Sequence, residues 1–91
     1  MAVKEKIQEE IALAEDLGFN HEIIMYNDDV NTFDHVIETL MRVCKHTAEQ
    51  AEQCSLIIHY KGKCTVKTGS MEELVPQCLQ LLDAGLSAEV V

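Results

Sequence analysis

The chain alternates between short runs of β-branched and aromatic residues and longer stretches whose apolar residues recur at helical spacing. Residues 22–26, Glu-Ile-Ile-Met-Tyr, have the composition of a short strand. We expect Asn31 to cap a helix that follows, because its side chain can accept a hydrogen bond from a free backbone N–H. The i, i+3, i+4, i+7 spacing predicts one buried face for this helix, formed by Phe33, Val36, Ile37, Leu40, Met41 and Cys44.

A second helix is predicted after Thr47, which can form a capping box with Gln50. Gly62 marks its expected end, since glycine readily takes the left-handed conformation that follows many helices. Residues 63–67 then alternate apolar and polar side chains, which is typical of a half-buried strand.

Ser70 followed by Glu73 is another capping box and predicts a third helix, with Gly85 as its end. The side chains expected to face inward are Leu74, Cys78, Leu81 and Leu82. Pro76 conflicts with a regular helix because it lacks a backbone N–H. Either the helix kinks there, or its regular part begins later than Ser70 implies. Residues 86–91 alternate again and predict a last strand.

The resulting order, β-α-α-β-α-β, predicts an α+β domain in which three helices pack on one face of a small three-stranded sheet. Residues 1–20 stand apart from this pattern. They are strongly charged and carry one narrow apolar stripe that ends at Gly18. We interpret residues 1–20 as a helix-prone, loosely attached extension of a core formed by residues 21–91.

Composition narrows the classes of partner. A net charge of −9, from 16 acidic and 7 basic residues, argues against nucleic acid or an anionic membrane and favours amine-bearing ligands. The N-terminus lacks the apolar segment of a signal peptide, and no apolar run reaches the roughly 18 residues of a membrane helix. These features predict a cytoplasmic protein with reduced thiols. Buried structural thiols are expected at Cys44, Cys54 and Cys78.

Two kinds of reactive centre are weakly indicated. Ser55 and His59 are four residues apart and share a helical face, so with Asp28 or Asp29 they could form a hydrolase triad. However, the chain lacks a Gly-x-Ser-x-Gly turn and a glycine-rich oxyanion loop, and a serine in mid-helix is poorly placed to attack. Four histidines and four cysteines show no metal-binding spacing. We therefore expect no metal and no cofactor.

A binding pocket fits the pattern better. Met25 and Asn27 share one strand face, and both predicted helices beside them offer apolar side chains. Asn27, Asp28 and His59 would then present acceptors above an apolar slot, which is the chemistry needed to hold an α-ammonium group. The alternative is that Asn-Asp-Asp only forms a turn, in which case the chain is a plain interaction domain without an amine site.

The segment NDDVNTFDHV, residues 27–36, with TAEQAEQCSLIIHYKGKC, residues 47–64, resembles the ClpS family. The resemblance runs from about residue 26 to residue 91. It implies a non-catalytic adaptor that binds N-degron substrates, which begin with a bulky hydrophobic residue and a free α-amino group. Such an adaptor delivers them to a Clp AAA+ unfoldase–protease.

The resemblance also implies residue roles. By matching position, Asn27, Asp28 and His59 would bind the α-amino group, and Asp29 would shape the loop. The pocket walls would be Met25, Phe33, Val36, Ser55, Ile58 and Leu86. Phe33 stands where the family often has a methionine, and Ser55 stands where it commonly has a larger apolar residue. The resemblance therefore leaves open which N-terminal residue of a substrate is preferred.

Contacts with the unfoldase are implied on the third helix. Glu72 matches the acid that contacts the N-terminal domain of the unfoldase, whereas Gln77 replaces the usual lysine. This leaves the partner open between ClpA-like and ClpC-like unfoldases. Residues 1–20 take the place of the segment that the unfoldase engages during delivery.

Overall fold

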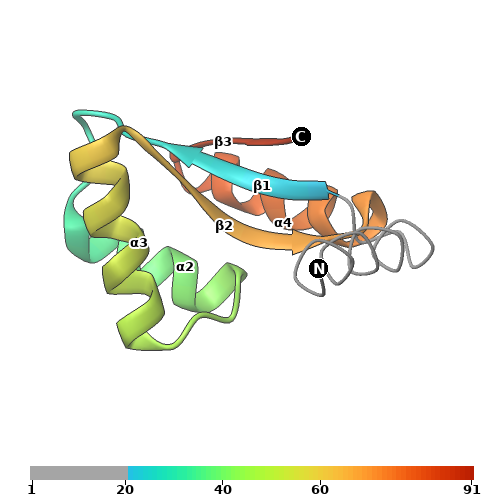
Figure 1. Ribbon diagram of the computed structural model, residues 1–91, viewed down its shortest axis with the longest axis horizontal. Helices are drawn as coiled ribbons and strands as arrows, with labels where there is room; N and C mark the ends of the chain where they lie inside the picture. The colour runs from blue at the N-terminus through green and yellow to red at the C-terminus, as the bar shows by residue number, and fades with distance from the viewer. Residues whose placement is uncertain (1–20) are drawn as a thin grey trace, which may run out of the picture.

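The computed structural model describes residues 21–91, and within them the element order is the predicted β-α-α-β-α-β (Figure 1). The elements are β1 (His21–Tyr26), α2 (Phe33–Val43), α3 (Ala48–Lys61), β2 (Lys63–Gly69), α4 (Met71–Asp83) and β3 (Ser87–Val90). The three strands form one antiparallel sheet in the order β2-β1-β3, so the first strand is central. The extension proposed for residues 1–20 lies outside the described residues.

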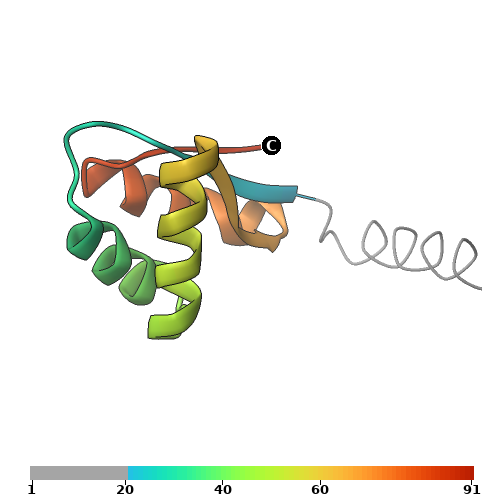
Figure 2. The same cartoon turned by 60° about the vertical axis from the view of Figure 1, so that its left-hand side comes forward.

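The three helices lie on the same side of the sheet, as predicted (Figure 2). Helix α4 runs along the strands and contacts all three of them, whereas α2 and α3 pack against each other beside it. The core between these layers is formed by buried side chains of β1, β2 and the three helices, together with one residue just after α2 and one just before β3. Its members are Ile23, Met25, Leu40, Val43, Cys44, Ala51, Ile58, Val66, Leu74, Cys78, Leu81 and Leu86.

Helix α2 differs from the prediction at its start and in its buried face. Its N-cap is Thr32, not Asn31, and the Thr32 hydroxyl accepts a hydrogen bond from the His35 N–H at 3.2 Å. Phe33 and Met41 were expected inside but are 40% and 41% exposed, whereas Thr39 and Val43 are buried. Because α2 contacts both α3 and α4, its buried side is set by two neighbours, which sequence spacing alone does not reveal.

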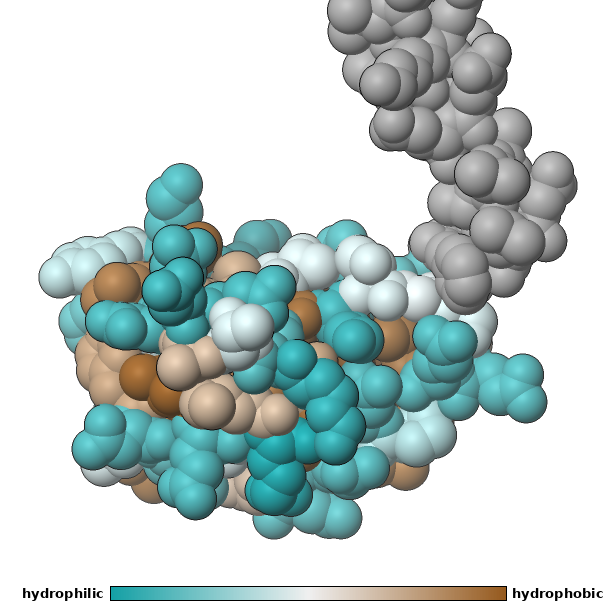
Figure 3. Space-filling view, turned by 90° about the horizontal axis from the view of Figure 1, so that it is seen from below, coloured by the Kyte–Doolittle hydropathy of each residue, from teal (hydrophilic) through white to brown (hydrophobic). Residues whose placement is uncertain are grey.

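Helix α3 follows the prediction at both ends. Thr47 and Gln50 form a complete capping box, and Gly62 ends the helix with a left-handed φ of 90°. On its surface and that of α2, exposed apolar side chains interrupt the polar residues. They include Phe33, Met41, Leu56 and Ile57. Apolar surface lies among the polar residues in the left-hand part of Figure 3.

Helix α4 begins at Met71 and continues through Pro76, so the alternative of a later start is wrong. The Ser70 hydroxyl caps it by accepting the Glu73 N–H at 3.2 Å. Pro76 removes a bond that the carbonyl of Glu72 would accept, and Glu72 is exposed, so solvent can satisfy that carbonyl. Leu82, expected inside, is 46% exposed. Gly85 has φ of 87° just after the helix, as predicted.

All four cysteines carry free thiols. Cys44 and Cys78 are buried as expected, whereas Cys54 is half-buried. Burial raises the pKa of Cys44 to about 11 and that of Cys54 to about 12, so both thiols are protonated at neutral pH. Within residues 21–91, no helix has the length and apolar character needed to cross a membrane.

Candidate functional site

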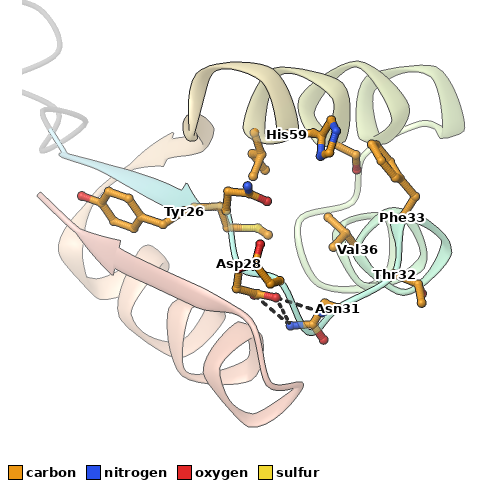
Figure 4. Close-up of a pocket in the computed structure, with 12 residues that line it drawn as sticks. Tyr26, Asp28, Asn31, Thr32, Phe33, Val36 and His59 are labelled. Atoms are coloured by element: carbon orange, nitrogen blue, oxygen red, sulfur yellow. Dashed lines mark hydrogen bonds between the residues drawn. The ribbon is translucent and has the colours of Figure 1, made fainter.

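A cavity of about 300 Å³ opens where the end of β1 meets α2 and α3 (Figure 4). Its walls come from the loop after β1, the first turns of α2 and the second half of α3. The residues that line it are Met25, Tyr26, Asn27, Asp28, Asp29, Asn31, Thr32, Phe33, Val36, Ser55, Ile58 and His59. Eight of the nine sequence positions proposed for amine binding and for the walls lie here, together with Asp29; the exception is Leu86, which is buried in the core.

The loop after β1 is held at both ends by hydrogen bonds. At its start, the Asn27 N–H donates to the Gly62 carbonyl at the end of α3, at 2.8 Å. At its far end, the Asn31 side-chain amide donates to the Gly85 carbonyl at 2.9 Å. Residues 27–31 are therefore tied to both α3 and the turn after α4, and this fixes one side of the cavity.

The Asp28 carboxylate organises the interior of this loop. It accepts hydrogen bonds from the backbone N–H groups of Val30 and Asn31 at 3.0 and 2.9 Å. Both of its oxygens also accept from the Asn31 side-chain amide, at 3.0 and 2.9 Å. These bonds, first among them the one from the Asn31 backbone N–H, lower the pKa of the Asp28 carboxyl. The loop contacts proposed for Asp29 are thus made by Asp28, while Asp29 is exposed beside the cavity.

His59, in the last turn of α3, is an exposed lining residue of the cavity. We call the exposed lining side chains the mouth of the cavity. The His59 ring packs against Phe33 with centroids 5.3 Å apart and an interplanar angle of 58°. Tyr60 meets the same ring edge-on at 5.1 Å. Contacts with these two aromatic rings restrict the His59 ring, so it can present a nitrogen to the mouth without a large loss of side-chain freedom.

The deep end of the cavity is formed by its three buried lining residues, Met25, Ser55 and Ile58, which we call the floor. Ser55 is 4% exposed, and its hydroxyl donates to the Ala51 carbonyl at 2.7 Å. Its proton is therefore directed at the helix backbone rather than at His59. This geometry does not support the hydrolase alternative, in which His59 would take that proton.

Metal binding is not supported by the described part of the chain. Within residues 21–91, no group of three or more His, Cys, Asp or Glu side chains is placed to hold a metal ion. His21, His35 and His46 each lie within hydrogen-bonding distance of a backbone carbonyl.

Comparison with known proteins identifies the family. The family model described as "ATP-dependent Clp protease adaptor protein ClpS" matches residues 19–89. The chain belongs to the ClpS family. It is 38% identical over 69 residues to the ClpS of Thermosynechococcus vestitus, and this alignment covers 75% of the present chain and 73% of that protein. It is 36% identical over 76 residues to the ClpS of Campylobacter jejuni, covering 77% and 79%.

Two further comparisons show how far the likeness extends. The solved structure of Agrobacterium tumefaciens ClpS2 bound to L-phenylalaninamide superposes with a TM-score of 0.75 at 16% identity. The superposition covers 78% of the present chain and 93% of the A. tumefaciens chain. A stretch of 56 residues is 36% identical to the E3 ubiquitin-protein ligase UBR1 of Drosophila melanogaster, covering 62% of this chain and 3% of that protein. The fold is thus that of ClpS, and the chain is a non-catalytic adaptor of the Clp protease.

The two positions that the ClpS resemblance assigned to the unfoldase lie on α4, outside the cavity. Glu72 is exposed, whereas Gln77 is half-buried, and its Oε1 is buried without a hydrogen-bond partner in residues 21–91. Five residues of a helix span about 140° of rotation. The two side chains therefore leave the helix in different directions, and Glu72 is the more accessible one.

Three lining residues of this ClpS cavity are not among the site residues that the sequence predicts: Tyr26, Asn31 and Thr32. The Tyr26 side chain points away from the cavity in Figure 4, and its hydroxyl donates to Glu89 on β3. The sequence pattern indicates Asn31 only as a helix cap. The available signal was the Asp-x-x-Asn spacing. In turns, an aspartate side chain commonly accepts a hydrogen bond from the residue three positions later.

Proposed function

We propose that the cavity binds the first residue of an N-degron substrate. The observation that carries this proposal is the separation of chemistry within one cavity of about 300 Å³. The floor is mainly apolar, through Met25 and Ile58, and the acceptors are at the mouth. An apolar N-terminal side chain would enter the floor while its α-ammonium stays among the acceptors. The A. tumefaciens relative is bound to L-phenylalaninamide, a molecule that combines an aromatic side chain with an α-amino group.

At the mouth, we assign the α-ammonium to Asn27, His59 and the two adjacent carboxylates. An ammonium group has three donors and binds most strongly to charged acceptors. Asp28 is already engaged by loop donors on both of its oxygens, whereas Asp29 is exposed at the cavity. We therefore propose that Asp29 supplies most of the direct carboxylate contact, and that Asp28 contributes its charge and holds the loop.

Replacement of Asn27 or His59 by alanine is expected to lower peptide affinity about tenfold each, because a bound ammonium would lose one partner. Both residues are exposed, so the melting temperature should stay within a few degrees of the wild-type value. The measurement is a fluorescence anisotropy titration with a labelled peptide that begins with phenylalanine.

A matched control is Gln53→Ala, an exposed position on α3 that does not line the cavity. Its affinity should equal that of the wild type. Unchanged affinity in both Asn27→Ala and His59→Ala would instead favour the plain interaction domain, in which the loop after β1 is only a turn.

Delivery requires a second surface, and we propose that it includes Glu72 on α4. The partner would be the N-terminal domain of a ClpA- or ClpC-like unfoldase, with Gln77 at the edge of the contact. We place this adaptor in the cytoplasm, where its four free thiols would remain reduced.

Residues 1–20 are proposed to serve delivery rather than binding. Every residue that lines the cavity lies between Met25 and His59, and the ClpS family model begins at residue 19. Deletion of residues 1–17 is therefore expected to change peptide affinity less than about twofold but to slow degradation strongly. The degradation assay uses an N-degron reporter and a reconstituted Clp protease. Normal degradation of the reporter in the presence of the truncated adaptor would contradict the delivery role. Lost peptide binding would contradict the proposal that residues 1–20 are not needed for binding.

A further inference from the structure

The floor of the cavity contains one polar side chain, that of Ser55. Its two buried neighbours in the lining, Met25 and Ile58, offer a thioether and a hydrocarbon. The other polar lining residues are exposed or half-buried and belong to the mouth or the loop. A bound N-terminal side chain whose amine sits at the mouth would therefore meet Ser55 near its tip.

The hydrogen bond that Ser55 already makes determines what it can offer to such a side chain. A serine hydroxyl has one donor and two acceptor lone pairs. The donor is used by the Ala51 carbonyl at 2.7 Å. What remains is a buried acceptor without a proton to give, so the complementary group is a donor at the tip of the bound side chain.

We propose that Ser55 selects an N-terminal tyrosine, whose phenol donates to the Ser55 oxygen. This inference rests on the proposed N-degron function and specifies its substrate class. Tyrosine and phenylalanine differ only by the para hydroxyl, which lies at the end of the side chain farthest from the α-amino group. Phenylalanine would displace solvent from the Ser55 oxygen without replacing its hydrogen bond, which disfavours it further.

The apolar surroundings strengthen this selection. A hydrogen bond between partners removed from water is stronger than one at the surface, and an unpaired buried acceptor is correspondingly costly. Neither Met25 nor Ile58 can substitute for Ser55, because a thioether is only a weak acceptor and isoleucine has none. The preference for tyrosine should therefore depend on this one hydroxyl.

The test compares three peptides that are identical except for the first residue, which is tyrosine, phenylalanine or 4-methylphenylalanine. The methyl compound has the size of tyrosine but no donor. By anisotropy, the wild-type adaptor should bind the tyrosine peptide roughly three to ten times more tightly than the 4-methylphenylalanine peptide. In Ser55→Ala that ratio should fall to about one.

Thr39→Val is the matched control. The Thr39 hydroxyl makes the same bond to a carbonyl four residues earlier, at 2.7 Å to His35, and Thr39 is 2% exposed but does not line the cavity. Its removal should leave the tyrosine preference intact. If Ser55→Ala does not fold, Ser55→Cys replaces it, since a thiol is a weak acceptor, and its ratio should also approach one.

Two results would overturn the inference: equal wild-type affinity for the tyrosine and 4-methylphenylalanine peptides, or a full tyrosine preference in the Ser55 variants. Either result leaves the proposed function standing, provided that the free peptides bind and their N-acetylated forms do not. Failure of all free peptides to bind would refute the proposed function itself.

Discussion

Acetylation of the α-amino group of a tyrosine- or phenylalanine-initiated peptide is expected to lower its affinity for this adaptor at least about 100-fold. Acetylation removes the positive charge and two of the three N–H donors, and it adds a carbonyl where the mouth offers acceptors. Each charged hydrogen bond that is lost costs about 1.5–3 kcal/mol, and about 1.4 kcal/mol corresponds to tenfold in affinity. Loss of two such contacts at Asn27, Asp29 or His59 therefore exceeds 100-fold.

The control peptide carries its acetyl group on an internal lysine and should bind like the unmodified peptide. A pH series provides an independent check. The ordinary pKa of an α-amino group is about 7.7–8.0, so affinity should fall above roughly pH 8. The loop bonds lower the pKa of Asp28, so its charge should persist throughout the mildly acidic range. Equal affinity for the free and N-acetylated peptides would refute amine recognition.

Local signals predicted the order and ends of the elements well, because capping chemistry is confined to neighbouring residues. The Thr47–Gln50 capping box and the glycines at 62 and 85 act within one turn of their helices. Burial on a helix depends instead on which neighbours cover it. Met41 and Leu82 satisfy the helical spacing of a buried face and are nevertheless exposed, because no described element covers them.

The cavity could be anticipated because its walls follow from periodicity. Phe33 with Val36 on α2 and Ser55 with Ile58 on α3 keep the spacing of neighbours on one helical face, and all four line the cavity. Leu86 could not be placed this way, since it lies between α4 and β3 and its side chain turns into the core. The sequence could not show that Asp28 rather than Asp29 makes the loop bonds. The two residues are adjacent and identical, and only the backbone conformation of the loop decides which carboxylate meets the free N–H groups.

The different roles of Asp28 and Asp29 lead to a prediction with two distinct outcomes. Asp28→Ala is expected to lower peptide affinity about 30- to 100-fold and the free energy of unfolding by about 1–2 kcal/mol. It removes a charge near the ammonium, and it also leaves the N–H groups of Val30 and Asn31 without the acceptor they have now. For a domain of this size, such a loss of stability lowers the melting temperature by roughly 4–16 °C.

Asp29→Ala should lower affinity at least about tenfold, because a direct charged hydrogen bond is lost. It should leave the melting temperature unchanged, because Asp29 is exposed and the loop bonds belong to Asp28. Asp28→Asn separates charge from loop structure. Its remaining side-chain oxygen can still accept the Val30 and Asn31 N–H groups, so it should lose affinity while retaining more stability than Asp28→Ala. The measurements are anisotropy and thermal unfolding on the same protein samples. If Asp28→Ala melts like the wild type, the carboxylate does not hold the loop; if Asp29→Ala binds like the wild type, the ammonium takes its charge from Asp28 instead.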